Sequence, residues 1–112
     1  MLVKRFEDAE PYEVPNHRQY TSLRCFKTGP GGSRAINFGI SHFLPGGGAG
    51  PDGSPSEKVY LVLAGELTVI VGGKETVLRQ HDSCVIAPGE VREIVNRGNS
   101  VCTIAVAVVA VS

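Results

Sequence analysis

Short runs of β-branched and aromatic residues, separated by turn residues, extend over most of the chain. Such runs with partial apolar and polar alternation are typical of β-strands, and no stretch keeps a helical period over the length of an ordinary helix. The separators are rich in Gly, Pro, Asn, Asp and Ser, which favour turns. The predicted strands begin at residues 20, 34, 57, 67, 75, 83, 91 and 101. The pattern therefore predicts an all-β barrel or sandwich.

Length and charge narrow the function classes. The chain has 112 residues, enough for one domain, and carries 11 Lys plus Arg against 11 Asp plus Glu. This balance gives no electrostatic reason to expect nucleic acid or an anionic membrane as a partner. The first residues, MLVKRFEDAE, do not read as a secretory signal, and the apolar run 101–111 is shorter than the roughly 20 residues of a membrane helix. We expect a cytoplasmic protein.

The three cysteines Cys25, Cys84 and Cys102 lie far apart, without a Cys-x-x-Cys spacing. Each lies among apolar or strand-like neighbours. The pattern predicts reduced thiols buried in the core of a cytosolic protein.

Two segments and the region between them resemble one family. Residues 45–65 read PGGGAGPDGSPSEKVYLVLAG and residues 81–96 read HDSCVIAPGEVREIVN. Residues 57–78 supply a strand, a tight turn, a second strand and a Gly-Gly hairpin in that order. Over residues 36–109 the chain resembles the cupin family. The resemblance implies an all-β, antiparallel jelly-roll barrel in a single domain, residues 21–112, preceded by an N-terminal arm, residues 1–20.

The chain departs from the family at the metal-binding positions. The two histidines of the first motif fall on Asp52 and Ser54, its glutamate near Lys58, and the histidine of the second motif on Arg92. Transition metals need imidazole, carboxylate or thiolate donors, whereas lysine and arginine offer hydrogen-bond donors and positive charge. We therefore expect no metal, no cofactor and a barrel interior suited to an anion.

Arg92 has two interpretations. A guanidinium pointing into the barrel grips a carboxylate or enolate with two parallel hydrogen bonds. Alternatively, Arg92 fills the vacated metal site in a structural salt bridge to Asp52, Glu57 or Glu90.

Lys58 also has alternatives. Burial beside Arg92 would lower the pKa of Lys58, suiting it as a general base, a Schiff-base nucleophile or a second cationic anchor. Otherwise its stem lines the wall while its ammonium reaches Asp52. A register slip of one residue would instead turn Glu57 inward.

Tyr60 shares a strand face with Lys58. A phenol next to two cations would have a lowered pKa and suit proton donation to an enolate. The other interpretation is an aromatic core residue with its hydroxyl at the rim.

Four further polar residues are candidates. Asp52 suits a general base or a counter-ion, and Ser54 a ligand contact, although residues 46–56 also fit a plain turn or a mobile barrel lip. His42 suits an acid, a base or a ligand contact. His17, in the predicted arm, and His42 are also candidates to rebuild a metal site with Asp52 or Glu57, because imidazole is a common transition-metal ligand, although no pair of them has ligand spacing.

Apolar side chains are expected to complete the ligand site. Val62 and Ile94 are the predicted wall residues, with Ile86, Phe38 and Phe43 as further candidates; which phenylalanine faces inward stays open.

The favoured function is a metal-independent enzyme acting on a small organic acid or keto compound by isomerase, lyase or decarboxylase chemistry. Lys58 and Arg92 would stabilise the developing negative charge. The alternatives are a small-molecule-binding or sensor protein without catalysis, and a structural barrel with a closed interior.

Both faces of the strand at 57–64 are apolar, as is the closing run 101–111. A strand that is apolar on two faces needs cover on both, and a second copy of a short chain supplies it. We therefore expect a homodimer.

Overall fold

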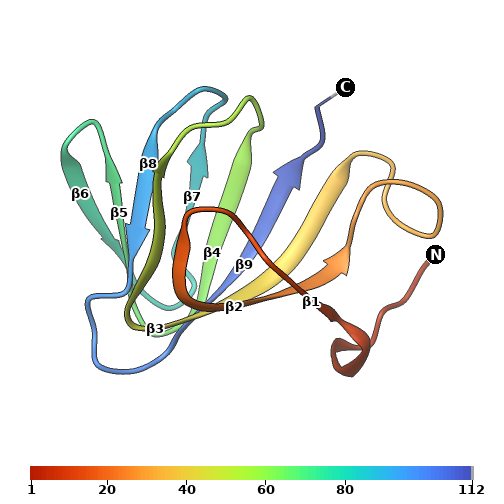
Figure 1. Ribbon diagram of the computed structural model, residues 1–112, viewed down its shortest axis with the longest axis horizontal. Helices are drawn as coiled ribbons and strands as arrows, with labels where there is room; N and C mark the ends of the chain where they lie inside the picture. The colour runs from red at the N-terminus through yellow and green to blue at the C-terminus, as the bar shows by residue number, and fades with distance from the viewer. Residues whose placement is uncertain (112) are drawn as a thin grey trace.

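The computed structural model describes residues 1–111, which form an almost entirely β structure (Figure 1). The described elements are η1 (Phe6–Asp8), β1 (Glu10–Tyr12), β2 (His17–Phe26), β3 (Ile36–Asp52), β4 (Lys58–Ala64), β5 (Leu67–Val71), β6 (Lys74–Leu78), β7 (Ser83–Ile86), β8 (Arg92–Val95) and β9 (Cys102–Val109). All their pairings are antiparallel. The predicted antiparallel jelly-roll barrel is confirmed.

The long strand β3 joins the two halves of the barrel. The strands follow the order β6-β5-β8-β3-β9-β4-β7, and β2 adds to β3 and carries β1. The first part of β3 pairs with β9 from Ile36 to Phe43, and its last part pairs with β8 from Gly48 to Asp52. One strand therefore passes from one layer to the other and curves the sheet around an interior (Figure 1).

The glycine-rich segment differs from the turn or mobile lip that we expected, because residues 46–52 continue β3. A Cβ atom on Gly47 would lie 2.5 Å from the carbonyl oxygen of Gln19, and one on Gly48 would collide with the carbonyl oxygen of Ile94. Glycine here permits β3 to pass between β2 and β8. The segment is thus part of the barrel wall.

Part of the predicted N-terminal arm lies in the sheet. β1 pairs with β2, and β2 pairs with β3 from His17 onward. The register shifts between Arg18 and Tyr20, and Gln19 between them has a φ of 47°. This bulge changes the phase of alternation, so that His17 and Tyr20 both pack toward the interior.

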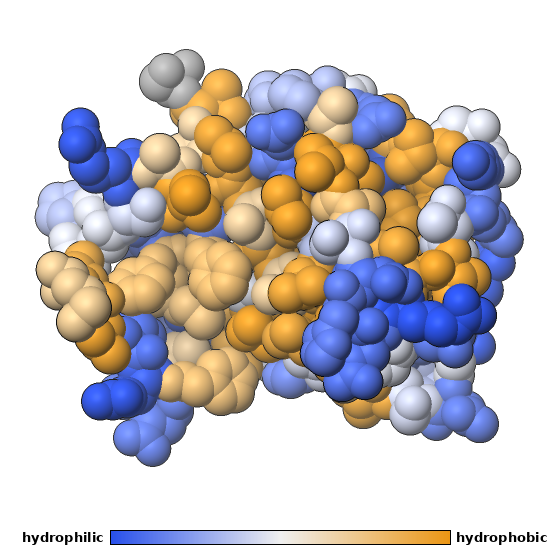
Figure 2. Space-filling view, turned by 180° about the vertical axis from the view of Figure 1, so that it is seen from behind, coloured by the Kyte–Doolittle hydropathy of each residue, from blue (hydrophilic) through white to orange (hydrophobic). Residues whose placement is uncertain are grey.

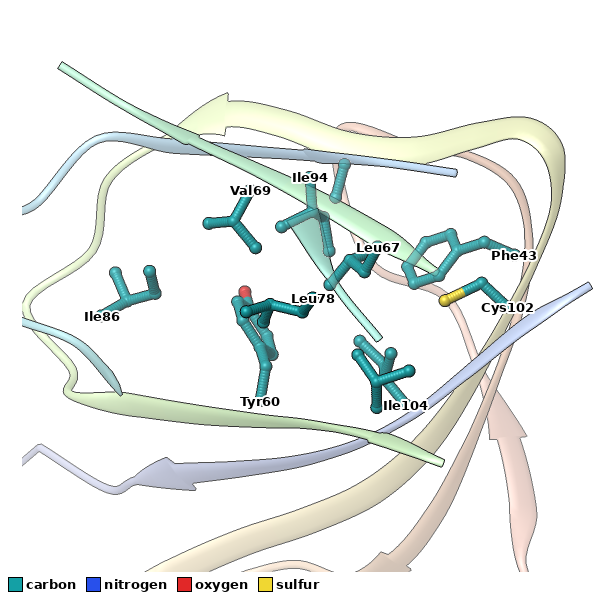
Figure 3. Packing of buried hydrophobic residues seen from close by; sticks show 11 residues of the cluster. Phe43, Tyr60, Leu67, Val69, Leu78, Ile86, Ile94, Cys102 and Ile104 are labelled. Carbon is teal, nitrogen blue, oxygen red and sulfur yellow. The ribbon is translucent and has the colours of Figure 1, made fainter. Parts of the chain in front are cut away.

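Apolar side chains from both layers meet between the sheets (Figure 3). Phe43 is 1% exposed and Ile94 is 1% exposed, whereas Phe38 lies on the outer surface. Cys102 is fully buried, and burial raises the pKa of its thiol to about 11, which keeps it unreactive. Cys25 and Cys84 are only half-buried, and all three thiols are free.

No helix among the described residues is long and apolar enough to cross a membrane.

Asn96 connects the loop after β8 to the core. Its side chain is fully buried; Nδ2 donates to the carbonyl oxygens of Phe43 (3.0 Å) and Ser100 (2.8 Å), and Oδ1 accepts from the backbone N–H of Gly98 (3.0 Å). A buried amide with these partners fixes the loop between β8 and β9.

We expect Asn96→Ala to lower the free energy of unfolding by about 2 kcal/mol, because buried backbone groups lose their partners. Asn99→Ala, at an exposed position of the same loop, should change it by less than about 0.5 kcal/mol. Urea unfolding followed by circular dichroism measures both values. Equal midpoints for the two variants would contradict the anchoring role of Asn96.

Candidate ligand site in the barrel interior

A cavity of about 100 Å³ lies between the layers of the barrel. Its polar wall consists of Tyr12, His17, Ser22, Ser41, Lys58, Tyr60 and Arg92. Its apolar wall consists of Val14, Phe43, Ile94, Ile104, Val106 and Val108. Five strands, β1, β2, β3, β4 and β8, thus bring polar groups from distant parts of the sequence to one small, partly apolar space.

Arg92 lies buried in the wall of this cavity. It begins β8 and is 5% exposed, and its Nε donates to the hydroxyl oxygen of Tyr60 at 2.8 Å. Its Nη1 is buried without a hydrogen-bond partner. Gly50 makes room for this nitrogen, because a Cβ there would lie 2.8 Å from Nη1.

The salt-bridge interpretation of Arg92 finds no support in the contacts. Among the ion pairs formed within residues 1–111, none includes Arg92 or Lys58. Glu90, one of the expected partners, instead accepts a hydrogen bond from the backbone N–H of Ala87 at 2.8 Å. Buried polar groups almost always have hydrogen-bond partners. The unpaired Nη1 of Arg92 can therefore donate a hydrogen bond to a ligand.

Tyr60 projects from β4 into the interior (Figure 3) and is 3% exposed. Burial raises the pKa of Tyr60, and the charge and hydrogen bond of Arg92 lower it by less. The expected lowering of the Tyr60 pKa was wrong, because desolvation outweighs the nearby cation. The bond from Arg92 uses a lone pair of the hydroxyl oxygen, so the phenolic hydrogen stays available to a ligand.

Lys58 faces the cavity, whereas Glu57 is exposed, so the register slip does not occur. Burial lowers the pKa of Lys58, the positive charge of Arg92 lowers it further, and Asp52 partly opposes both. Lys58 and Arg92 are the two Lys or Arg side chains of the cavity wall, which contains no carboxylate.

His17 joins the same cavity, although the sequence placed it in an arm. Its Nδ1 lies 2.9 Å from the carbonyl oxygen of Pro15, and its ring stacks on Phe43 at 6.1 Å between centroids. Burial lowers the pKa of His17, and the carbonyl of Pro15 raises it in part. The bulge at Gln19 carries no clear sequence signal, which explains why the place of His17 in the cavity was not predicted.

The structure brings Lys58, Tyr60, Arg92 and Ile94 together around the cavity. Val62 does not line the cavity; it is fully buried in the apolar core.

His42 lies on the opposite face of β3, because strand alternation turns its neighbours Ser41 and Phe43 inward. Its Nδ1 is 2.9 Å from the hydroxyl oxygen of Thr103, outside the cavity. The predicted catalytic role of His42 therefore has no place in this site.

Asp52 and Ser54 lie outside the cavity wall. Asp52 ends β3 opposite Arg92 and is half-buried, where its charge raises the pKa values of His17 and Lys58. Ser54 forms a local turn, its hydroxyl oxygen accepting from the backbone N–H of Ser56 at 3.2 Å. Asp52 acts on the site through its charge, and Ser54 supports the turn.

The donor groups do not fit the transition metal that the family resemblance implies. Residues 1–111 contain no cluster of three His, Cys, Asp or Glu side chains placed to hold a metal ion. Lys58 and Arg92 occupy positions of the expected ligands, and their charges oppose cation binding. The arrangement suits a ligand oxygen that carries negative charge.

The family profile described as "Cupin domain" matches residues 39–109. A protein of Mycobacterium tuberculosis named beta-D-galactosidase is 40% identical over 97 residues, which are 87% of this chain and 84% of that protein.

Solved structures share the fold. The polyketide cyclase RemF from Streptomyces resistomycificus superposes with a TM-score of 0.84 at 18% identity, over 97% of this chain and 79% of that one. A predicted oxalate decarboxylase from Thermotoga maritima gives a TM-score of 0.76 at 21% identity, over 98% and 100%. At these identities the likeness shows the fold alone.

We expect Arg92→Leu to raise the free energy of unfolding by about 1–4 kcal/mol, because it removes a buried, unpaired cation from an apolar surrounding. Arg34→Leu, at an exposed position, should change it by less than about 0.5 kcal/mol. Thermal and urea unfolding measure both. A loss of stability in Arg92→Leu would show that the guanidinium serves the fold.

Proposed function

Because the chain belongs to the cupin family, we propose that its barrel interior is the site of a metal-independent enzyme for small organic acids or keto compounds. The reaction is of the isomerase, lyase or decarboxylase type. The observation that carries the proposal is the buried guanidinium of Arg92, whose Nη1 lacks a partner.

Charge in the cavity supports an anionic ligand. Arg92 and Lys58 both line the wall, and no Asp or Glu side chain does. A carboxylate or enolate oxygen would supply the partner missing at Nη1 and receive a second hydrogen bond from the Tyr60 hydroxyl. Fixed donors aimed at developing negative charge are a large source of catalytic rate.

The size and apolar part of the cavity limit the ligand further. About 100 Å³ suits a molecule of a few non-hydrogen atoms, and Phe43, Ile104 and Val106 provide apolar contacts. We therefore favour a short acid or keto acid with a small apolar end.

Galactoside hydrolysis is a second candidate, favoured by the 40% identical relative that carries the name beta-D-galactosidase. Most glycosidases use two carboxylic acid groups, one on each side of the scissile bond. The cavity wall contains none, and Asp52 is a single half-buried carboxylate nearby. We therefore favour small organic acids and keto compounds over galactosides as substrates. A protein that binds such a ligand without catalysis is the remaining alternative.

We also propose a homodimer formed through the outer face of β3, β9 and β4. Residues 36–44, 59–64 and 102–109 contain no Lys, Arg, Asp or Glu. Phe38, Val59 and Val109 are 39%, 40% and 43% exposed on these strands. Figure 2 shows apolar side chains across much of the face that is seen from behind. The same surface of a second copy can cover a broad uncharged surface of this kind.

The three free thiols fit a reducing compartment, and we propose that the protein is located in the cytoplasm.

Isothermal titration calorimetry with pyruvate, 2-oxobutyrate and acetate tests the site. We expect binding to chelator-treated wild-type protein and at least about tenfold weaker binding to Arg92→Leu, equivalent to 1.4 kcal/mol or more. Arg34→Leu is the matched control and should bind like wild type.

Equal affinities of wild type and Arg92→Leu would remove the guanidinium from the site and refute the proposal. Hydrolysis of 4-nitrophenyl β-D-galactoside by the chelator-treated protein, with no binding of the acids, would favour the galactosidase function instead.

For the dimer, we expect Val59→Lys to shift wild-type dimers to monomers, because it buries an unpaired charge in the interface. Val77→Lys, on the edge strand β6 and with a similar exposure of 41%, should remain dimeric. Light scattering after size-exclusion chromatography measures both masses. A monomeric wild-type protein would contradict the proposal.

A further inference from the structure

We propose that His17 is the catalytic base of the cavity, taking a proton from the carbon next to the carbonyl group of a small 2-oxo acid. This inference rests on the proposed function, since Arg92 must hold the substrate oxygen in the same cavity. His17 and Arg92 both line it, from β2 and β8.

The contact with Pro15 fixes the tautomer of the imidazole. Nδ1 lies 2.9 Å from the carbonyl oxygen of Pro15, and a carbonyl oxygen only accepts hydrogen bonds. Nδ1 therefore carries the hydrogen. Because a neutral imidazole has a single N–H, Nε2 presents a lone pair.

Aromatic neighbours hold the ring in position. Its centroid lies 5.1 Å from that of Tyr20 and 6.1 Å from that of Phe43, with the second ring nearly parallel at 26°. Packing on two sides and a hydrogen bond to the backbone limit rotation of the imidazole. A base oriented in this way needs little reorganisation before proton transfer.

The charges around His17 favour its neutral form. Burial lowers the pKa of His17 most, and Arg92 on β8 and Lys58 on β4 lower it further. Asp52 on β3 and the carbonyl of Pro15 act in the opposite direction without reversing the shift. At neutral pH the ring is therefore unprotonated and ready to accept a proton.

The transfer balances within substrate and protein. The C3–H bond of the 2-oxo acid breaks, and its proton moves to Nε2 of His17 to give an imidazolium. The electron pair of that bond forms the C2–C3 double bond, while the carbonyl π pair moves to the oxygen as an enolate held by Arg92. Return of the proton to carbon restores the keto acid, and its delivery to oxygen gives the enol. No oxidant or reductant is needed.

Tyr60 suits the opposite role. Burial raises the pKa of Tyr60, so its phenol remains a hydrogen-bond donor, and its oxygen already accepts from Arg92. The division of roles is therefore a base at His17 and an oxyanion site at Arg92 and Tyr60.

The test is deuterium exchange at C3 of 2-oxobutyrate in D₂O, followed by proton NMR with chelator-treated protein of residues 1–112. Wild type should exchange the C3 hydrogens above the rate in buffer. His17→Gln should be at least about 100-fold slower, the usual loss for a missing general base. Calorimetry should give His17→Gln an affinity for 2-oxobutyrate within about threefold of wild type.

His81→Asn is the matched control. His81 is exposed at a backbone φ of 71°, a conformation that asparagine tolerates, and it lies outside the cavity wall. Its exchange rate should equal that of wild type.

The pH dependence separates a base from a structural residue. Exchange by wild type should rise with pH as His17 loses its proton, with a midpoint below its ordinary pKa of 6.5. His17→Gln should lack this rise.

Three outcomes separate failure of the His17 proposal from failure of the proposed function. If His17→Gln exchanges deuterium as fast as wild type, the role of His17 is refuted, and this includes the case in which only Lys58→Met loses exchange. Binding of 2-oxobutyrate without exchange by wild type would refute it as well. Failure of wild type to bind pyruvate, 2-oxobutyrate and acetate would refute the proposed function itself.

Discussion

The close approach of β3 to β2 and β8 is the constraint on which both the barrel and its cavity depend. Gly47 and Gly48 allow backbone contacts that no larger residue fits, and β3 thereby crosses from one layer to the other. The same approach pairs Asp52 with Arg92, the first residue of β8. Gly50 leaves the space that Nη1 of Arg92 occupies. The position of the buried cation is thus a consequence of how the sheet closes.

Desolvation decides the chemistry inside the barrel more than the pairwise charges do. It is the largest cause of the lowered pKa values of His17 and Lys58 and of the raised pKa of Tyr60. All three shifts favour the neutral forms of these side chains. A small, partly apolar interior lined by the basic side chains of Arg92 and Lys58, and by no carboxylate, is suited to a ligand that carries negative charge. The unpaired guanidinium is a cost to the fold that the proposed anionic ligand would offset.

Much of the architecture followed from local pattern. Alternation within residues 57–64 correctly predicted that Lys58 and Tyr60 lie on one face of the strand. The predicted Gly72–Gly73 hairpin joins β5 to β6. The conformation of residues 46–52 was harder to predict, because glycine is as typical of a turn as of a close backbone contact. His42 and His17 show the limits of the site prediction. Alternation places His42 outside the barrel, but its direction depends on which face of β3 is inside, a property of the assembled sheet.

The sequence by itself determined the all-β class, the family and the replacement of metal-donor residues by Lys58 and Arg92, because strand alternation and residue chemistry are local properties. The tertiary structure decided that Arg92 lacks an acidic partner and that the pKa of Tyr60 rises. It also placed His17 in the cavity, through a bulge whose direction depends on pairing with β3. These features depend on burial and on contacts between strands that lie far apart along the chain, which no local pattern specifies.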